Sequence, residues 1–318
     1  MSYSQFTKTQ GSLMLLVFFL LFSGFNADKP LKKLDLKLNF KKGQVLAISN
    51  VMEQTISQTI MGTDNSFKQN VGMYYTMTVK DIVEGTYSIE VNYSKTTFKT
   101  ANPAASVDFD SDLNKEDIAP MAMGFAALVG ESFTIRMDEK GNVVEVLGME
   151  DFLENVVNNL MEMNPEMGSA MAETMKQQYG GGALSQGMES MTMYFPPKAV
   201  KEGDSWERTS KVNMNFEMEI SNTFTLDQVK DGKAYISVSS VLNTNKDKEI
   251  EMQGMKMKYD LLGTQKGTFI VDVESGWVLE SDIDQDIDGN MSLESPQIPN
   301  PMDVPMAIES KVQTIWIK

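Results

Sequence analysis

Hydrophobic and polar residues alternate along most of the chain from residue 34 onward. The pattern is clear at 34–40, 87–94 and 214–220, where every second residue is apolar. Because successive side chains of a strand point to opposite faces of a sheet, this period predicts antiparallel strands with one face toward water. Turns such as Glu84-Gly85 and Asp231-Gly232 separate the runs, and glycine tolerates the positive φ of tight hairpins. The pattern predicts a mainly β fold of the α+β class.

Three blocks of the sequence occur twice in the same order. The pairs are 41–46 with 201–206, 78–91 with 225–238, and 133–146 with 269–282. The shared order predicts two related antiparallel halves, each a curved sheet, that either pack together or continue as one large sheet. Unrelated hairpins can also resemble one another, so a fold without a repeat stays open as the alternative.

The period changes to 3.6 residues between the two halves. Apolar residues from Met149 to Met161 follow one helical stripe, Asn164-Pro165 interrupts it, and a second helix is expected to about Gln178. Three glycines at 180–182 end helical structure, and a further short helix is expected within 118–129. These helices are predicted to form a Met-rich cover. The predicted organisation is a signal peptide at 1–27, a first β half at 28–148, a helical insert with a Gly-rich link at 149–195, and a second β half at 196–318.

An apolar run near the start of the chain predicts export. Leu13–Phe25 is shorter than the roughly 20 residues of a membrane-spanning helix and suits an export signal. Cleavage after Ala27 or Gly24 gives a periplasmic or extracellular bacterial protein with no transmembrane span in the mature chain. A bulky Phe25 or Phe22 then fills a position that usually takes a small residue, so an uncleaved anchor is the alternative.

Composition excludes several classes of function. The 318 residues include no histidine and no cysteine, which removes Ser-His-Asp and Cys-His catalysis, thiol redox chemistry and conventional zinc sites. The net charge of -16 opposes a nucleic-acid partner, because affinity for phosphates comes from Lys and Arg. A pair of carboxylates suffices for a glycosidase, but no pair stands out. We therefore expect a non-enzymatic protein without a cofactor.

The block 195–206, FPPKAVKEGDSW, carries a resemblance to a known family. With the export signal, the β halves and the Met-rich middle, it resembles a family of uncharacterised exported proteins of the Bacteroidetes, over most of residues 30–318. That resemblance implies a domain of unknown function and brings no catalytic residues. The expected plan, a curved sheet with helices over its open side, is also similar to the LolA-type lipid carriers of the bacterial envelope, as a likeness of architecture alone.

Methionine enrichment suggests a binding surface. The chain has 26 methionines, many in the predicted helices, and flexible Met side chains adapt to varied apolar partners. A cavity under these helices would accept a lipid or lipopeptide, with the candidate residues Met121, Met123, Phe125, Met161, Met167, Met171 and Met175. The alternatives are that Met replaces Leu as core filler, or that spacings such as Met188-x-x-Met191-x-Met193 bind Cu(I).

An acidic stripe suggests a second kind of site. Acids occupy every second position of 280–288, and Asp284, Asp286, Asp288 and Glu294 resemble the ligands of a calcium loop. Glu294 stands one position too early for that loop, and strands flank the segment, so a solvated strand face is the other interpretation. The alternative function is therefore a structural or interaction module whose acidic face, with or without calcium, docks an envelope protein.

Overall fold

The computed structural model describes residues 33–101, 106–169, 194–213, 217–252, 255–294 and 301–317. All of them belong to one compact unit, Lys33–Lys318. The described residues are 65% strand and 11% helical, which confirms the mainly β fold class. None of the helices in the described ranges combines the length and hydropathy needed to cross a membrane.

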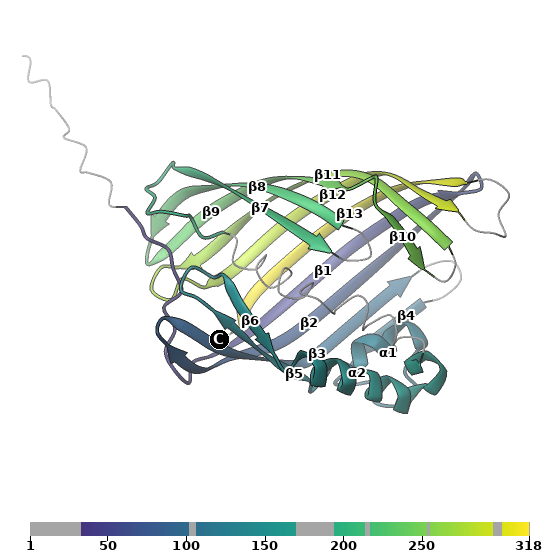
Figure 1. Cartoon of the computed structure of the whole chain (residues 1–318), viewed down its shortest axis with the longest axis horizontal. Coiled ribbons are helices and arrows are strands. Elements are labelled where there is room, and N and C mark those ends of the chain that lie inside the picture. Colours follow the sequence, from purple (N-terminus) through teal and green to yellow (C-terminus); the bar gives the residue numbers. More distant parts are fainter. Residues whose placement is uncertain are drawn as a thin grey trace, which may run out of the picture. The chain divides into compact units, whose positions relative to one another are not determined.

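The described strands form one antiparallel sheet. Its strands are β1 (Val45–Ile60), β2 (Thr63–Val83), β3 (Thr86–Ala101), β4 (Ser106–Asp110), β5 (Ser132–Met137), β6 (Val143–Leu147), β7 (Ser205–Asn213), β8 (Glu217–Lys230), β9 (Lys233–Thr244), β10 (Glu249–Met252), β11 (Met255–Asp272), β12 (Val278–Glu294) and β13 (Met302–Ile317). Their order is β6-β5-β3-β2-β1-β13-β12-β11-β9-β8-β7, with β4 beside β3 and β10 beside β11. The last strand, β13, pairs with both β1 and β12 and so joins the two halves into one sheet (Figure 1).

The repeated sequence blocks occupy corresponding strands. Each half is a meander of five strands, β1-β2-β3-β5-β6 and β7-β8-β9-β11-β12. Gly43 precedes β1 with φ of 83° and donates to the Val79 carbonyl at 2.8 Å; Gly203 precedes β7 with φ of 84° and donates to the Leu226 carbonyl at 2.7 Å. Two matching turns with the same backbone bonds support an internal repeat.

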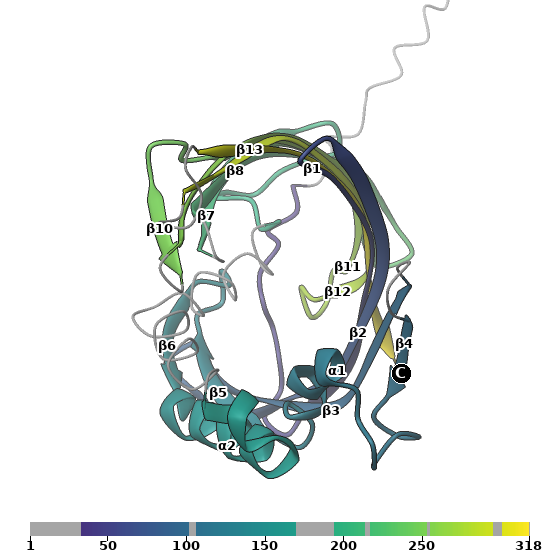
Figure 2. The same cartoon turned by 90° about the vertical axis from the view of Figure 1, so that its right-hand side faces the viewer.

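The sheet is strongly curled, and the segment before β1 crosses its concave side (Figure 2). Alternation at 34–40 predicts a strand, but this segment forms only an isolated bridge between Leu34 and Val200. Its backbone instead bonds to two hairpin loops: the Leu38 N–H donates to the Glu139 carbonyl at 2.7 Å and the Asn39 N–H to the Ser275 carbonyl at 2.9 Å. The strand prediction is wrong because no single strand runs alongside the segment.

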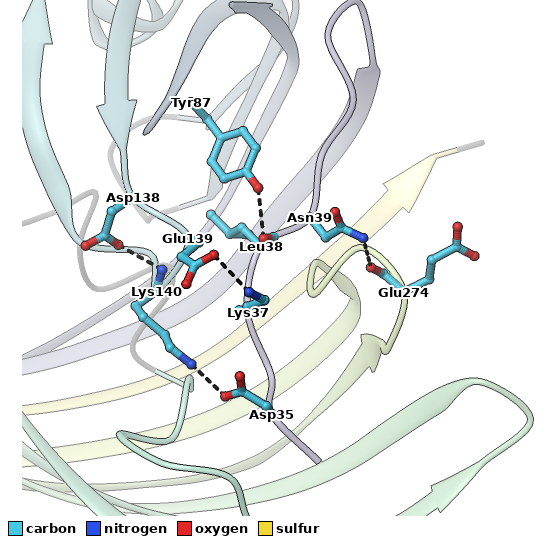
Figure 3. Close-up of polar contacts among 9 residues, drawn as sticks. All are labelled: Asp35, Lys37, Leu38, Asn39, Tyr87, Asp138, Glu139, Lys140 and Glu274. Atoms are coloured by element: carbon cyan, nitrogen blue, oxygen red, sulfur yellow. Dashed lines mark hydrogen bonds and ion pairs between the residues drawn. The ribbon is translucent and has the colours of Figure 1, made fainter. Parts of the chain in front are cut away.

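Side chains of the same segment hold both loops as well. Lys37 pairs with Glu139 at 2.9 Å, and the Asn39 amide donates to the Glu274 carbonyl at 3.1 Å. The Tyr87 hydroxyl donates to the Leu38 carbonyl at 2.9 Å (Figure 3). The two loops are the β5–β6 and β11–β12 hairpins, which correspond in the repeat. The segment therefore links equivalent hairpins of the two halves.

Two helices pack near one end of the sheet. These are α1 (Pro120–Ala126) and α2 (Met149–Met163), and α2 buries Phe152, Val156 and Leu160, as its apolar stripe predicts. Their contacts with strands are to β3, β4 and β5. Residues 165–169 are helical after Asn164, and the rest of the predicted second helix lies outside the described residues. The helices that are described thus cover the β3–β5 region of the sheet.

Candidate functional site

A row of polar side chains crosses nine strands on the concave face of the sheet. From β3 to β7 its members are Thr100, Gln69, Gln54, Ser310, Gln285, Gln265, Ser240, Asn222 and Arg208. Each lies directly opposite the next in the strand register. They share this face with buried Leu46 and Ile48 of β1, because residues an even number apart on a strand point the same way. We name this set the polar row.

Apolar residues border the polar row on both sides. On the side of the N-terminal segment the opposing residues are Phe98, Val71, Met52, Val312, Ile283, Gly267, Val238, Phe224 and Trp206. On the other side they are Phe67, Ile56, Ile308, Ile287, Gly263, Leu242 and Ile220. The polar row thus lies between two apolar borders, which we call the first and the second zone.

The two apolar zones belong to separate hydrophobic clusters. The main core includes Leu36, Leu38, Phe152 and Tyr194 and contains Val238, Phe224 and Trp206 of the first zone. Val71 and Phe98 of that zone belong to a smaller cluster with Ala122 of α1. The second zone contains Met218, Leu242, Leu261 and Ile287, with Ile220, Tyr259, Met306 and Ile308 packed against them. We name this second cluster the distal zone. It lies on strands β8 to β13, away from β3, β4 and β5, where the described helices make their strand contacts.

Hydrogen bonds connect one end of the polar row. The Gln69 amide donates to the Gln54 carbonyl oxygen at 2.5 Å, and the Gln54 amide donates to the Ser310 hydroxyl at 3.1 Å. These bonds run across β2, β1 and β13, so the polar groups on this side of the row satisfy one another within the half-buried face.

The other end of the row is connected in the same manner. The Ser240 hydroxyl donates to Asn222 Oδ1 at 2.7 Å, and the Asn222 amide donates to the Arg208 carbonyl at 3.3 Å. Both Ser240 and Asn222 are buried. The Arg208 side chain in turn donates to the Phe195 carbonyl at 3.3 Å.

Two glutamines stand between the connected ends. Gln265 of β11 lies opposite Gln285 of β12, and both side chains are partly buried. Within the described part of the chain, neither amide makes a side-chain hydrogen bond by ordinary geometric criteria, although each offers two donors and an acceptor. The centre of the row is therefore the place where its hydrogen-bonding capacity is unused.

Glycines on either side of Gln265 shape this centre. Gly263 and Gly267 point to the same face, two residues before and after it. A Cβ at Gly263 would lie 2.7 Å from the Asp286 carbonyl oxygen, and one at Gly267 would overlap the Asp282 carbonyl oxygen. Only glycine permits this close backbone approach, which accompanies sharp bending of a sheet. No side chain therefore flanks Gln265 along its own strand.

Residues 84–278 match a family of unknown function, DUF6263. The chain belongs to this family. The matched region begins in the turn before β3 and ends at the start of β12, so it contains Gln265 and the β7–β9 part of the polar row. The prediction of an uncharacterised domain is confirmed. None of the curated proteins compared with this DUF6263 chain matches it.

Solved structures resemble the DUF6263 chain only distantly. The lipovitellin structure titled "Lipid-protein interactions in lipovitellin" is 8% identical with a TM-score of 0.44, covering 88% of this chain and 26% of that one. DynF, from the dynemicin biosynthesis pathway of Micromonospora chersina, is 6% identical with a TM-score of 0.22, covering 92% and 88%. The DUF6263 chain thus corresponds to about a quarter of the lipovitellin chain. At these scores neither likeness carries an argument.

The structure places the predicted methionine site beside α1 and α2. Met123 and Met167 are partly buried against the main core, and Phe125 stacks on Phe98 at 4.8 Å. Met121 and Met161 are exposed, by 51% and 37%. The two others, Met171 and Met175, lie outside the described residues. The DUF6263 structure therefore does not gather the described members around one space, and the methionines of the distal zone, Met218 and Met306, come from strands.

The predicted calcium ligands lie along β12 on the outer face of the sheet. Asp284, Asp286 and Asp288 occupy every second position, which spaces them about 7 Å apart, and Glu294 is the last residue of the strand. A calcium loop must instead curl its ligands around the ion. Among the residues that the DUF6263 structure describes, no group of three or more acids is placed to hold a metal. The four candidates are not brought together.

A hollow of about 550 Å³ lies at β1, β2, β3, β12 and β13, and its lining combines outer-face residues with Gln54, Gln69, Thr100 and Ser310 of the polar row. Its charged lining residues are Glu53, Lys68, Lys99, Asp284, Asp286, Glu309 and Lys311. Beside it, Lys311 approaches Asp282 to 3.0 Å. Hydrogen bonds from Gln313 and Lys311 lower the pKa of the Asp282 carboxyl below its usual range. The acidic stripe is thus part of a mixed, solvated surface of the DUF6263 protein.

Sequence reasoning missed the polar row, although several strands carry a local sign of it. Asn222 lies between Ile220 and Phe224 among the alternate residues of β8 that are otherwise apolar. Gln285 lies in the same way between Ile283 and Ile287 of β12. A polar residue that interrupts an apolar face is the signal. Its meaning appears only when the register places all such interruptions side by side.

Proposed function

We propose that this protein is an exported, non-enzymatic protein of the bacterial cell envelope that binds an apolar ligand, a lipid or lipopeptide, on the concave face of its sheet. The observation that carries the proposal is the distal zone, a second hydrophobic cluster beyond the polar row. This cluster includes partly exposed apolar side chains, Ile220, Tyr259, Met306 and Ile308, on a concave face, which suits an apolar ligand.

The main core and the distal zone differ in what covers them. Leu36 and Leu38 of the N-terminal segment, Tyr194 and α2 all pack into the main core. The distal zone consists of strand residues, of which Met218, Leu242, Leu261 and Ile287 are buried and Ile220, Tyr259, Met306 and Ile308 are partly exposed. The described helices make their strand contacts elsewhere. Each methylene of an acyl chain that leaves water for such a surface contributes about 0.8 kcal/mol. An acyl chain that lies along β8–β13 therefore obtains most of its binding free energy from contact with this zone.

The residues of the distal zone suit ligands of variable shape. Met218 and Met306 contribute unbranched thioether side chains that adjust to different chains, as was expected of the helical methionines. The apolar run Leu13–Phe25 supports export. The resemblance to exported proteins of the Bacteroidetes and to the plan of LolA-type lipid carriers agrees with a role in the envelope.

A matched pair of variants tests the proposal. The purified protein is analysed by native mass spectrometry and its organic extract by lipid analysis, and the affinity for a fluorescent C16 fatty acid is measured. Ile308→Thr, in the distal zone, is expected to weaken binding about tenfold, because it removes about two buried carbon groups from the ligand contact. Ile315→Thr, on the opposite face of β13 and 47% exposed, should leave affinity unchanged. Absence of any apolar ligand and of fatty-acid binding would overturn the proposal.

A second candidate function uses the outer face. The hollow contains carboxylates of Asp286 and Glu309 on neighbouring strands, which supports docking of a cationic segment of an envelope protein. Replacing Asp284 and Asp286 by Asn should then abolish capture of that partner, while fatty-acid affinity stays at its original value. Unchanged capture by this double variant would contradict the docking function.

A further inference from the structure

The polar row has one gap in its hydrogen bonding, and that gap lies between the two apolar zones. Residues bonded on one side are Gln69, Gln54 and Ser310, and on the other Ser240 and Asn222. Gln285 and Gln265 lie between them, opposite each other on β12 and β11. The unused amides therefore stand midway along the row.

A hydrocarbon chain that extends along the concave face from the distal zone to the apolar border at Ile283 and Val312 must cross this row. Ile287 and Ile283 lie two residues on either side of Gln285, so each apolar border is about 7 Å from the row. A plain alkyl chain over this point would exclude water from both amides and leave them without partners. An unsatisfied buried polar group costs about 1–3 kcal/mol, so such a chain is disfavoured there.

We infer that the ligand carries a carbonyl linkage, an ester or an amide, between two apolar segments, and that Gln265 and Gln285 hydrogen-bond to it. This inference rests on the proposed function and names its ligand class. The carbonyl oxygen accepts from a glutamine N–H, and the N–H of an amide linkage donates to a glutamine oxygen. Acyl esters are the linkage of glycerolipids, and acyl amides are that of lipopeptides.

Gly263 and Gly267 let β12 approach β11 closely on either side of Gln265. Neither projects a side chain beside Gln265, whereas the other strands carry an apolar side chain at most of the equivalent positions. This close approach holds Gln265 directly opposite Gln285, so that both amides can reach one carbonyl linkage. Larger residues at either glycine would collide with the β12 backbone and separate the two strands.

Three uncharged probes with the same two alkyl segments test the inference: the ester hexyl palmitate, the amide N-hexylpalmitamide and the ether hexadecyl hexyl ether. The native protein is expected to bind the ester or the amide about tenfold more tightly than the ether, because the ether lacks the carbonyl acceptor. In the double variant Gln265→Leu with Gln285→Leu, this preference should vanish while ether affinity is retained. Gln313→Leu, the same replacement on the outer face of β13, should keep the preference.

The outcomes separate the inference from the proposed function. If none of the probes binds, the proposed function fails. If the ether binds as tightly as both carbonyl probes, or if the double variant keeps the preference, apolar binding stands and the role of the glutamines is overturned. The single variants Gln265→Leu and Gln285→Leu, each verified by circular dichroism, provide the comparison if the double variant does not fold. Tighter binding of the ester indicates a glycerolipid as the ligand, and tighter binding of the amide indicates a lipopeptide.

Discussion

Asp286 of β12 lies directly opposite Glu309 of β13 on the outer face of the sheet. One row further along the same strands, Asp284 lies opposite Lys311, with their charged atoms 3.9 Å apart. Carboxylates directly opposite on paired strands repel each other, whereas opposite charges attract. The strand pair β12–β13 therefore has an attractive charge pair, Asp284 with Lys311, next to a repulsive one, Asp286 with Glu309.

Reversing the charge of Glu309 should stabilise the protein. Glu309→Lys would place an ammonium group opposite Asp286, and we expect the free energy of unfolding to rise by about 0.2–1 kcal/mol. Urea unfolding at low ionic strength measures the change, which should shrink in 1 M salt. The control Lys311→Glu should lower stability, because it adds a carboxylate opposite Asp284. An increase in the free energy of unfolding in both variants would contradict this electrostatic explanation.

Leu38 should contribute strongly to stability although it lies outside the regular strands. Its side chain is only 1% exposed within the main core. We expect Leu38→Ala to lower the free energy of unfolding by about 2–5 kcal/mol, since it leaves a cavity where the N-terminal segment packs. Asp35→Ala removes only an exposed ion pair with Lys140, so a change of at most about 1 kcal/mol is expected. Chemical denaturation of both variants provides the comparison; equal losses would argue against burial as the cause.

Gly276 is predicted to be far less replaceable than other turn glycines. It has φ of 71°, and a Cβ there would overlap the Lys37 carbonyl, whereas Gly85 has φ of 78° and nothing within 4 Å. Gly85→Ala should cost about 1–2 kcal/mol from its backbone conformation alone. Gly276→Ala has the same backbone cost and also pushes the N-terminal segment away at Lys37, so we expect a larger loss of unfolding free energy. Thermal unfolding of the two variants tests this, and a smaller loss at Gly276 would refute the contact.

Buried tyrosines should make the protein sensitive to alkali. Burial raises the pKa of Tyr75 and of Tyr194 well above the ordinary range. The unfolded chain releases these protons near pH 10, but the folded protein retains them, so stability is full below pH 10 and falls as pH rises beyond it. Urea midpoints at pH 8 and pH 11 measure the fall. Tyr75→Phe should reduce it, and an unchanged pH dependence in that variant would exclude Tyr75 as a cause.

Local patterns were sufficient to predict the elements of the fold. The period of two in 87–94 falls within β3, the repeated block 225–238 spans the β8–β9 hairpin, and the stripe from Met149 to Met161 falls within α2. These features depend on neighbouring residues, because the direction of a side chain on a strand or helix follows from backbone geometry. The matching turns at Gly43 and Gly203 also agree with the repeated sequence blocks.

The same alternation could not distinguish a paired strand from the segment 34–40. Its apolar residues are buried as predicted, but its backbone partners are loops near residues 139 and 275. Those partners are about 100 and 236 positions away in sequence. The local pattern indicates which side chains are buried, whereas the choice of backbone hydrogen-bond partners depends on distant parts of the chain.

The sequence by itself determined a mainly β, acidic chain without histidine or cysteine, with polar interruptions such as Asn222 and Gln285 inside apolar strand faces. Only the tertiary structure decided that these interruptions form one row. That alignment requires β13 to insert between β1 and β12 and every strand pair to adopt a particular register. A shift by one residue would turn each interruption to the opposite face, and register is set by hydrogen bonds and packing between strands rather than within them.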